Sequence, residues 1–333
     1  MTRPSITILA EAAQGFEGNP RQALLLARAA ATGGADLVKF QLVYADELAL
    51  PGYRYYDLFR SLEMTDADWQ AVRSEAEARK IGLAFDVFGP RSLQLALTLK
   101  ARVVKIHATD FFNDELVREV LTKAPEVHLS LGGIRADELT RFFDKHSALP
   151  LDKIVLMGGY QAEPTPIGVN NLARLGQLRE RFPRQRVGWM DHADGAADEA
   201  RWLGVLAVPF GISVLEKHIT LARPLELEDG ISALDPEAFR EYVARVRVAE
   251  QAVGQPSLEL TADEAAYRRR ALKSVVATTD LRGGQAVPAT ALTLKRAVLT
   301  EGRYPLQQLE RAIGRKLVHD VAAGAALYED DVP

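Results

Sequence analysis

Ser213-Val214-Leu215-Glu216-Lys217-His218 is the stretch that decides the fold of this 333-residue chain. Its apolar residues are followed by ionisable ones, which is typical of a strand that is buried along its length and ends at a polar edge. Seven similar runs precede it: Ser5–Glu11, Asp36–Gln41, Gly82–Val87, Ala101–His107, Val127–Leu131, Lys153–Met157 and Arg186–Met190. The sequence therefore predicts eight strands that are buried on both faces.

Stretches with helical periodicity alternate with these runs. They are Pro20–Thr32, Ala67–Arg79, Asp114–Lys123, Ile167–Glu180 and Asp235–Val253. Eight strand and helix units in roughly 250 residues is the usual size of a closed barrel, so we predict a (β/α)₈ TIM barrel over residues 1–254. An open doubly wound sheet is the alternative. The polar residues at the strand ends favour the barrel, because all eight carboxyl ends of a barrel meet at one mouth.

A different pattern begins at the Gly-Gln-Pro-Ser stretch of residues 254–257. A charged segment follows it, and we predict a linker over residues 255–270. Residues 271–333 are predicted to form a small β-rich domain, with strand-like pieces at Lys273–Thr278 and Leu292–Lys295 and a short helix over Pro305–Ile313. This domain is too small to hold a deep active site alone.

Composition excludes several functional classes. With 41 basic and 45 acidic side chains the formal net charge is -4, so there is no electrostatic basis for binding nucleic acid. The absence of cysteine excludes disulfides, thiolate ligands and cysteine nucleophiles. No apolar stretch reaches the roughly 18 residues of a membrane span, and the first residues lack a signal-peptide pattern. We expect a cytoplasmic protein that acts on small molecules.

Two histidines end neighbouring strands, in Asp191-His192 and Glu216-Lys217-His218. Both imidazoles are expected at one mouth, where two neutral rings with open positions suit a divalent cation such as Mn²⁺, Zn²⁺ or Fe²⁺. Alternatively, each ring bonds to the neighbouring backbone. His107 also ends a strand and is either a third ligand or a packing residue. We assign the remaining histidines to structure: His128, His146 and His319.

Charged residues at other strand ends predict an anion site and a proton-transfer group. Lys39 and Lys105 lie two strands apart, and a mouth with two lysines suits phosphate or carboxylate. The alternative is that each lysine pairs with a neighbour such as Asp86 or Glu11. Glu11 and Glu216 would be adjacent in a closed ring, and crowding raises the proton affinity of carboxylates, so either is a candidate general base.

Together these residues resemble the sialic acid synthase family, which includes synthases of related nonulosonic acids and spore-coat polysaccharide homologues. The resemblance covers nearly the whole chain. In the barrel it is carried by Ala10-Glu11, Gly34–Gln41, Lys105-Ile106, Gln161, Pro164-Thr165-Pro166, Asp191-His192, Glu216–Thr220 and Asp229. Near the C-terminus, Lys295-Arg296 and Ile313–Leu317 are similar to an antifreeze-like (SAF) module.

The resemblance implies a transferase that condenses phosphoenolpyruvate with the open-chain aldehyde of an N-acyl amino sugar, giving a nine-carbon 2-keto acid and phosphate. It implies that His192 and His218 hold a divalent metal, Mn²⁺ first and Mg²⁺ or another divalent ion as alternatives, which polarises the aldehyde.

The same resemblance implies a role for each site residue. It assigns substrate binding to Lys39, Lys105, Ser130 and Gln161, the first three toward phosphoenolpyruvate. It implies that Glu11, Gln41 and Asp229 are catalytic and orient sugar hydroxyls and water, with Glu11 transferring the proton. Glu216 joins these catalytic candidates because of its strand-end position. It also implies a domain-swapped homodimer, in which Arg296 of the small module meets the sugar in the other subunit.

The chain departs from the family pattern at several positions. Asp86 lies in Phe85-Asp86-Val87-Phe88 where the family usually has Ser-Thr-Pro-Phe, and Ala108 and Met190 stand where serines are common. Glu163 takes a usual tyrosine position. Because an acid beside a phosphate costs Coulomb energy, two alternative functions stay open: a metal-dependent aldolase or lyase that acts on a 2-keto acid, and a non-catalytic sugar-binding homologue.

Overall fold

The computed structural model describes residues 5–254 and 256–332. Residues 1–4, 255 and 333, which include the first residue of the predicted linker and the last of the predicted small domain, lie outside the described residues. The chain divides into two compact units, residues 1–255 and residues 256–333. Within the described residues, no helix combines the length and the apolar composition that crossing a lipid bilayer requires.

The strands of the first unit form a closed parallel barrel in sequence order. They are β1 (Thr7–Ala13), β2 (Leu37–Gln41), β3 (Gly82–Val87), β4 (Val103–Ile106), β5 (Val127–Ser130), β6 (Ile154–Gly158), β7 (Arg186–Asp191) and β8 (Val214–His218). β1 pairs with both β2 and β8, which closes the ring. Each of the eight predicted runs overlaps one of these strands, with bounds that differ by one or two residues at most ends, and the predicted (β/α)₈ barrel is confirmed.

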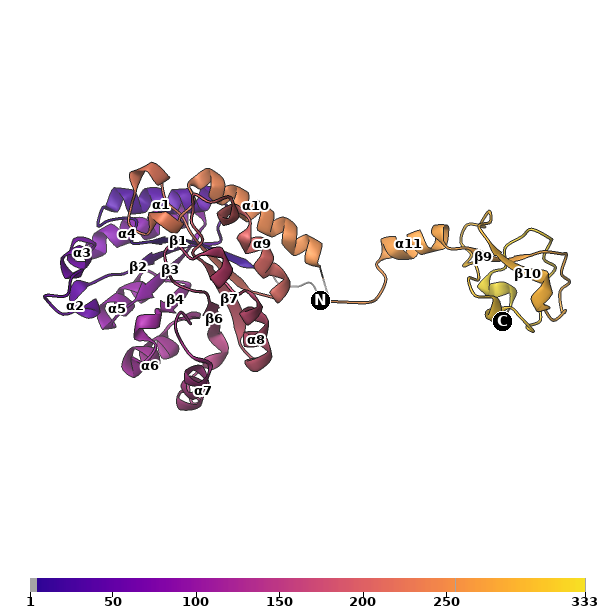
Figure 1. Ribbon diagram of the computed structural model, residues 1–333, viewed down its shortest axis with the longest axis horizontal. Coiled ribbons are helices and arrows are strands. Elements are labelled where there is room, and N and C mark those ends of the chain that lie inside the picture. Colours follow the sequence, from indigo (N-terminus) through magenta and orange to yellow (C-terminus); the bar gives the residue numbers. More distant parts are fainter. Residues whose placement is uncertain (1–4, 255, 333) are drawn as a thin grey trace. The chain divides into compact units, whose positions relative to one another are not determined.

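Helices surround the strands (Figure 1). They are α1 (Pro20–Thr32), α2 (Ala45–Leu48), α3 (Tyr56–Ser61), α4 (Asp66–Arg79), α5 (Pro90–Thr98), α6 (Asp114–Lys123), α7 (Ala136–Lys145), α8 (Ala173–Arg181), α9 (Leu203–Ala207) and α10 (Pro236–Val253). α1 begins where predicted because the Asn19 side chain accepts hydrogen bonds from the backbone N–H groups of Arg21 and Gln22. The helix predicted over Ile167–Glu180 is divided into a 3₁₀ turn, Ile167–Val169, and α8.

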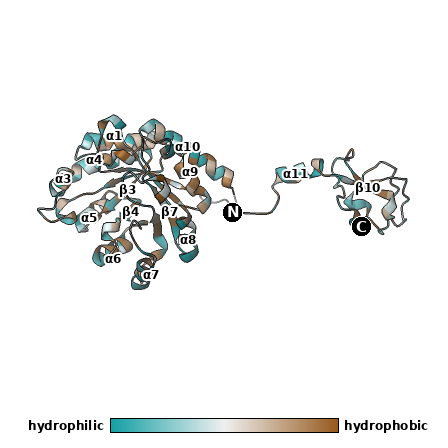
Figure 2. Ribbon diagram, in the orientation of Figure 1, coloured by the Kyte–Doolittle hydropathy of each residue, from teal (hydrophilic) through white to brown (hydrophobic). Residues whose placement is uncertain are grey.

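Two kinds of side chain fill the barrel interior, one layer above the other. Apolar residues form the lower layer in two buried clusters: Leu9, Leu37, Ala84 and Val103, and Val155, Met157, Met190 and Val214. Side chains of a strand return to the same face every second residue. The residues two positions after Leu9, Leu37, Ala84, Val103 and Val214 are therefore also interior, and they are Glu11, Lys39, Asp86, Lys105 and Glu216. Figure 2 shows the apolar colouring along the strands. The apolar layer excludes water from below the charged one.

The second unit has a hydrophobic core of its own, which includes Val275, Leu281 and Leu327. Its strands β9 (Ser274–Ala277) and β10 (Leu292–Lys295) pair antiparallel. Helix α11 (Ala262–Ala271) lies in the segment predicted as linker and begins with a capping box between Thr261 and Glu264.

The helix predicted over Pro305–Ile313 is wrong. Pro305 forms a bridge with Tyr328, and the backbone N–H of Leu306 donates to the Leu327 carbonyl at 2.8 Å. Because of this pairing, the start of the segment is extended. Within the segment only Leu309–Arg311 forms a 3₁₀ turn. The tertiary pairing overrides the local helical pattern.

Candidate active site

A buried charge network occupies the barrel interior at the carboxyl ends of the strands. Lys39 Nζ forms ion pairs with Glu11, with Asp86 Oδ2 at 2.8 Å and with Glu216 Oε1 at 3.7 Å. Lys105 Nζ pairs with Glu216 Oε1 at 2.7 Å. The register explains the proximity, because Glu11 is the cross-strand partner of Lys39 and Asp86 that of Lys105. The predicted alternative, in which the lysines pair with neighbouring acids, is what the structure contains.

This network carries three carboxylates and two ammonium groups, none more than 2% exposed. One oxygen of Asp86 and one of Glu216 are buried without a hydrogen-bond partner among the described residues. Unpartnered buried carboxylate oxygens are costly. They leave two acceptor positions that substrate hydroxyls, water or a cation can satisfy.

The two glutamates of this network have pKa values shifted in opposite directions. Burial raises the pKa of Glu11 well above its usual value, with the Glu216 and Asp86 charges adding to burial and the Lys39 ammonium opposing it. Burial also favours protonation of Glu216, but Lys105 and Lys39 outweigh it and hold the pKa of Glu216 below its usual range. Burial works against the charge on Lys39, yet the surrounding carboxylates raise its pKa. One acid of the site is thus shifted toward holding a proton and the other toward losing it, the arrangement that favours proton transfer.

The two strand-end histidines lie close together at the mouth of the barrel. His192 follows β7 and His218 ends β8, and their ring centroids are 5.1 Å apart. Burial, more than the neighbouring charges, lowers the pKa of His192 to about 3 and that of His218 well below its usual value. Both rings are therefore neutral. His192 Nδ1 is buried without a partner among the described residues, so it does not have the backbone bond of the alternative interpretation.

Glu163 completes a group of three with these histidines. Ligand atoms of Glu163, His192 and His218 all lie within 4.8 Å of one another, and Glu163 Oε1 is 3.7 Å from His218 Nε2. Burial first, and then the Asp229 and Glu228 charges, raise the pKa of Glu163 to about 8. Two neutral imidazoles and one carboxylate are a common donor set for divalent Mn, Fe or Zn, so the residues present fit such a cation.

The loop after β6 carries Glu163 to this position. The Thr165 backbone N–H donates to the His192 carbonyl at 2.8 Å, and the Thr165 hydroxyl donates within the loop to the carbonyls of Tyr160 and Ala162 at 2.8 Å each. These bonds bring residues nearly thirty positions apart in sequence together. The sequence signal for this ligand is the carboxylate of Glu163 at a position where the family usually has tyrosine.

His107, the third ligand considered from the sequence, lies outside this group. Its Nε2 is 3.4 Å from the Gln161 amide nitrogen, and its Nδ1 is 3.2 Å from the Thr109 hydroxyl. The ring tilts against Phe88 at a centroid distance of 6.1 Å. His107 therefore lines the cavity as a polar and stacking residue.

A second ion pair outside the barrel interior holds the histidine-bearing strand ends. Lys217 Nζ lies 3.3 Å from Asp191 Oδ1 and donates to the Ala193 carbonyl at 3.2 Å. The Tyr242 hydroxyl donates to the other oxygen of Asp191 at 3.1 Å. Because these residues flank His192 and His218 in sequence, their bonds fix the backbone from which both imidazoles project.

Some of the remaining predicted site residues line the cavity at the barrel mouth, and others do not. A cavity of about 320 Å³ at the mouth is lined by Glu11, Gln14, Gln41, Leu48, Phe59, Asp86, Phe88, Lys105, His107, Thr109, Gln161, Glu163, His192, Glu216, His218 and Asp229. Gln14 joins Gln41 and Asp229, since its side-chain amide donates to Gln41 Oε1 at 2.8 Å and its backbone N–H to Asp229 Oδ2 at 3.1 Å. Gln14 is a cavity residue that was not predicted from the sequence.

Three predicted substrate-binding residues are absent from that lining. Lys39 is fully buried and pairs with Glu11 and Asp86. Ser130 is also buried, and its hydroxyl contacts Met190 Sδ at 3.9 Å. Arg296 belongs to the second unit, where it is exposed just after β10.

Comparison with known proteins gives consistent results. The model of the NeuB family matches residues 26–257. Pseudaminic acid synthase of Campylobacter jejuni is 26% identical over 346 residues, covering 99% of this chain and 97% of the relative. N-acetylneuraminate-9-phosphate synthase of Homo sapiens is 26% identical over 340 residues, covering 97% and 91%.

Solved structures share the fold. The putative spore coat polysaccharide biosynthesis protein E of Chromobacterium violaceum aligns with a TM-score of 0.79 at 21% identity, covering 98% of this chain and 99% of that one. The sialic acid synthetase of Leptospira borgpetersenii, solved with citrate, aligns with a TM-score of 0.71 at 22% identity over 80% of this chain and 92% of that one.

Proposed function

This chain belongs to the NeuB family, and from that membership we propose that it is a synthase that condenses phosphoenolpyruvate with the open-chain aldehyde of an N-acyl amino sugar. In the reaction C3 of phosphoenolpyruvate bonds to the aldehyde carbon, water adds at C2, and phosphate leaves with the former enol oxygen. The product is a nonulosonic 2-keto acid. Relatives named as pseudaminic acid, N-acetylneuraminate-9-phosphate and legionaminic acid synthases support this class of product.

The observation that carries the proposal is the position of a buried glutamate and two imidazoles around one cavity. Glu11, His192 and His218 all line it. A divalent cation held by His192, His218 and Glu163 would polarise the aldehyde carbonyl. Glu11 would give its proton to the aldehyde oxygen as the new carbon–carbon bond turns that oxygen into a hydroxyl. Lys105, on the cavity wall, would attract the anionic donor.

Other residues would orient the two substrates. Gln41, Gln161 and Asp229 line the cavity and offer amide and carboxylate groups for sugar hydroxyls. Lys39 does not line the cavity, so its charge would affect phosphoenolpyruvate indirectly, through the carboxylates with which it pairs. Ser130 would need to turn from Met190 to reach a substrate.

Incubation with Mn²⁺, phosphoenolpyruvate and a panel of N-acyl hexosamines tests the proposal. Phosphate and a 2-keto acid should form in equal amounts with at least one sugar, and His218→Ala should abolish both. Arg184→Gln, an exposed position outside the cavity lining, serves as the matched control. Absence of both products across the panel, with the metal bound, would contradict the proposal.

One observation favours a second candidate, an aldolase or lyase that acts on a 2-keto acid. Asp86 pairs with Lys39 at 2.8 Å and places a negative charge in the interior, where a phosphate dianion would be repelled. Pyruvate carries a single negative charge and no phosphate. This candidate predicts pyruvate release from a sugar-derived 2-keto acid, detected with lactate dehydrogenase, and no phosphate release under any condition.

For the second unit we propose an antifreeze-like (SAF) module that reaches the partner's barrel in a domain-swapped homodimer. Support comes from the Lys295-Arg296 and Ile313–Leu317 motifs and from its separate core. In such a dimer Arg296 would contact the sugar in the other subunit. Multi-angle light scattering of the full chain checks the dimer, which a monomer mass would contradict.

A further inference from the structure

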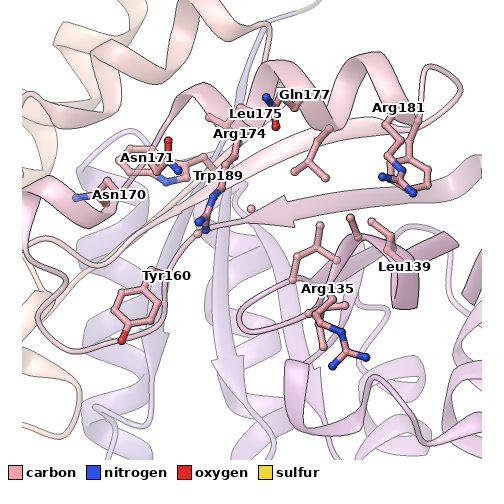
Figure 3. Close-up of a pocket in the computed structure, with 17 residues that line it drawn as sticks. Arg135, Leu139, Tyr160, Asn170, Asn171, Arg174, Leu175, Gln177, Arg181 and Trp189 are labelled. Carbon is pink, nitrogen blue, oxygen red and sulfur yellow. The ribbon is translucent and has the colours of Figure 1, made fainter. Parts of the chain in front are cut away.

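A second cavity of about 400 Å³ opens on the side of the barrel, separate from the mouth. It lies between α7 and α8 and reaches the ends of β6 and β7 (Figure 3). Its volume is within the usual range of small-molecule sites. Tyr160 lines this cavity, whereas Gln161 and Glu163 line the mouth, so the loop after β6 contributes to both.

All the charged side chains that line this cavity are positive. Three arginines contribute to it, Arg135, Arg174 and Arg181, and no aspartate or glutamate is among its lining residues. In a chain of net charge -4 this is a local excess of positive charge. Clefts of one sign with low-dielectric walls concentrate counter-ions of the opposite sign.

The three arginines differ in how they are engaged. Arg135 pairs with Glu138 at 2.7 Å and with Asp137 at 3.3 Å. Arg181 donates to the Thr140 hydroxyl at 3.1 Å. The guanidinium of Arg174 has no acidic partner within 4 Å among the described residues, and Figure 3 shows this arginine on the cavity wall formed by α8. Arg174 is therefore the cation available to a ligand.

The rest of the lining supplies apolar area and neutral hydrogen-bonding groups. Leu139, Leu175 and Phe182 provide apolar surface, and Asn170 and Asn171 provide amides. Trp189 also lines the cavity, and its indole N–H is buried without an acceptor among the described residues. An acceptor atom brought in by a ligand would satisfy that donor.

We infer that this cavity binds a small organic anion, a carboxylate, sulfonate or phosphate ester attached to an apolar ring or chain. The anionic group meets Arg174, and the ring packs on the leucines and Phe182. This site is distinct from the mouth, and its existence does not depend on the reaction proposed above.

A dye titration of the full chain tests the inference, using 8-anilinonaphthalene-1-sulfonate as the probe. The wild-type chain should bind the dye with enhanced fluorescence and with energy transfer from tryptophan. Arg174→Gln should weaken binding about ten-fold, because a charge-assisted contact is lost. Arg184→Gln, the same charge change at an exposed position outside the lining, should leave the affinity unchanged. Circular dichroism verifies that both variants are folded.

A second variant and a neutral probe make the test decisive. Arg135→Gln, on the α7 side, should also weaken dye binding, by less than Arg174→Gln because Arg135 is already paired. N-phenyl-1-naphthylamine, which lacks the sulfonate, should bind at least ten-fold more weakly than the anionic dye. Equal affinity of wild type, Arg174→Gln and Arg184→Gln would overturn the inference, as would equal affinity for the two dyes.

Discussion

Glu163 Oε1 lies 3.7 Å from Nε2 of His218, although the two residues belong to different β/α units of the barrel. The carboxylate reaches the histidine pair from a loop that hydrogen bonds to the His192 backbone. A metal site at the mouth would therefore have one ligand that the strand-end pattern did not include. This relationship leads to the first prediction.

Glu163→Gln should lower the affinity for Mn²⁺ by at least about ten-fold, because it removes the one anionic ligand of the group. Isothermal titration calorimetry and the electron paramagnetic resonance signal of free Mn²⁺ measure this directly. Glu226→Gln, an exposed acid outside the group whose charge does not shift the pKa of Glu163, is the control. If His107→Ala weakens binding and Glu163→Gln does not, the ligand assignment is wrong.

Asp86→Ser should strengthen phosphoenolpyruvate binding about ten-fold, as a lower KM or a larger thermal shift with the donor. The substitution removes a carboxylate from the Lys39 network and offers a hydroxyl, while Glu11 still pairs with the lysine. Asp86→Asn separates the effect of charge from that of the hydroxyl. Weaker donor binding in both variants would mean that Asp86 takes part in the site as a carboxylate.

Mixed dimers test whether Arg296 acts in the partner's barrel. Subunits with His218→Ala and subunits with Arg296→Ala should each be inactive, whereas dimers that contain one of each should regain roughly half of wild-type activity per dimer. One of the two sites then has an intact barrel and an intact arginine from the other chain. Co-expression with two different affinity tags isolates the mixed dimer. Inactive mixed dimers would place Arg296 over its own barrel, and active Arg296→Ala dimers would place it outside the site.

Glu126 lies just before β5, at the end of the barrel opposite the site. We predict that its contribution to the stability of the fold depends on pH. Burial favours its neutral form, but hydrogen bonds from His128 at 3.1 Å and Arg186 at 2.7 Å outweigh burial and lower the pKa of Glu126 to about 2. This value is below that of the unfolded chain, so the carboxylate stabilises the fold above about pH 4.5 and the effect disappears as the pH falls toward 2.

Glu126→Gln should therefore reduce the free energy of unfolding by about 2 kcal/mol at pH 7. The difference from wild type should remain constant down to about pH 4.5 and narrow below it. Urea unfolding at pH 7, 5 and 3 measures the three values. Glu119→Gln, which removes an exposed i,i+4 pair with Lys123, should change stability far less at every pH. A difference independent of pH would exclude the carboxylate as its source.

Much of this site could be read from strand periodicity. The ends of eight apolar runs placed Glu11, Lys105, His192 and His218 at one mouth, because parallel strands in a closed ring bring their carboxyl ends together. Lys39 was expected at the same mouth, but it is fully buried and does not line the cavity. The predicted helix over Pro305–Ile313 failed because pairing with Tyr328 is a long-range contact that local pattern does not contain.

By itself the sequence determined the barrel, its order of strands and the types of residue at its mouth. These features follow from the local pattern of apolar and polar residues and from the alternation of strand and helix segments along the chain. The tertiary structure alone decided which charges neutralise one another and which carboxylate joins the histidines. Those outcomes depend on distances across the ring, from Glu216 to Lys105 and from Glu163 to His218. Electrostatic interaction falls with distance and with solvent access, and neither quantity is defined until the chain has folded.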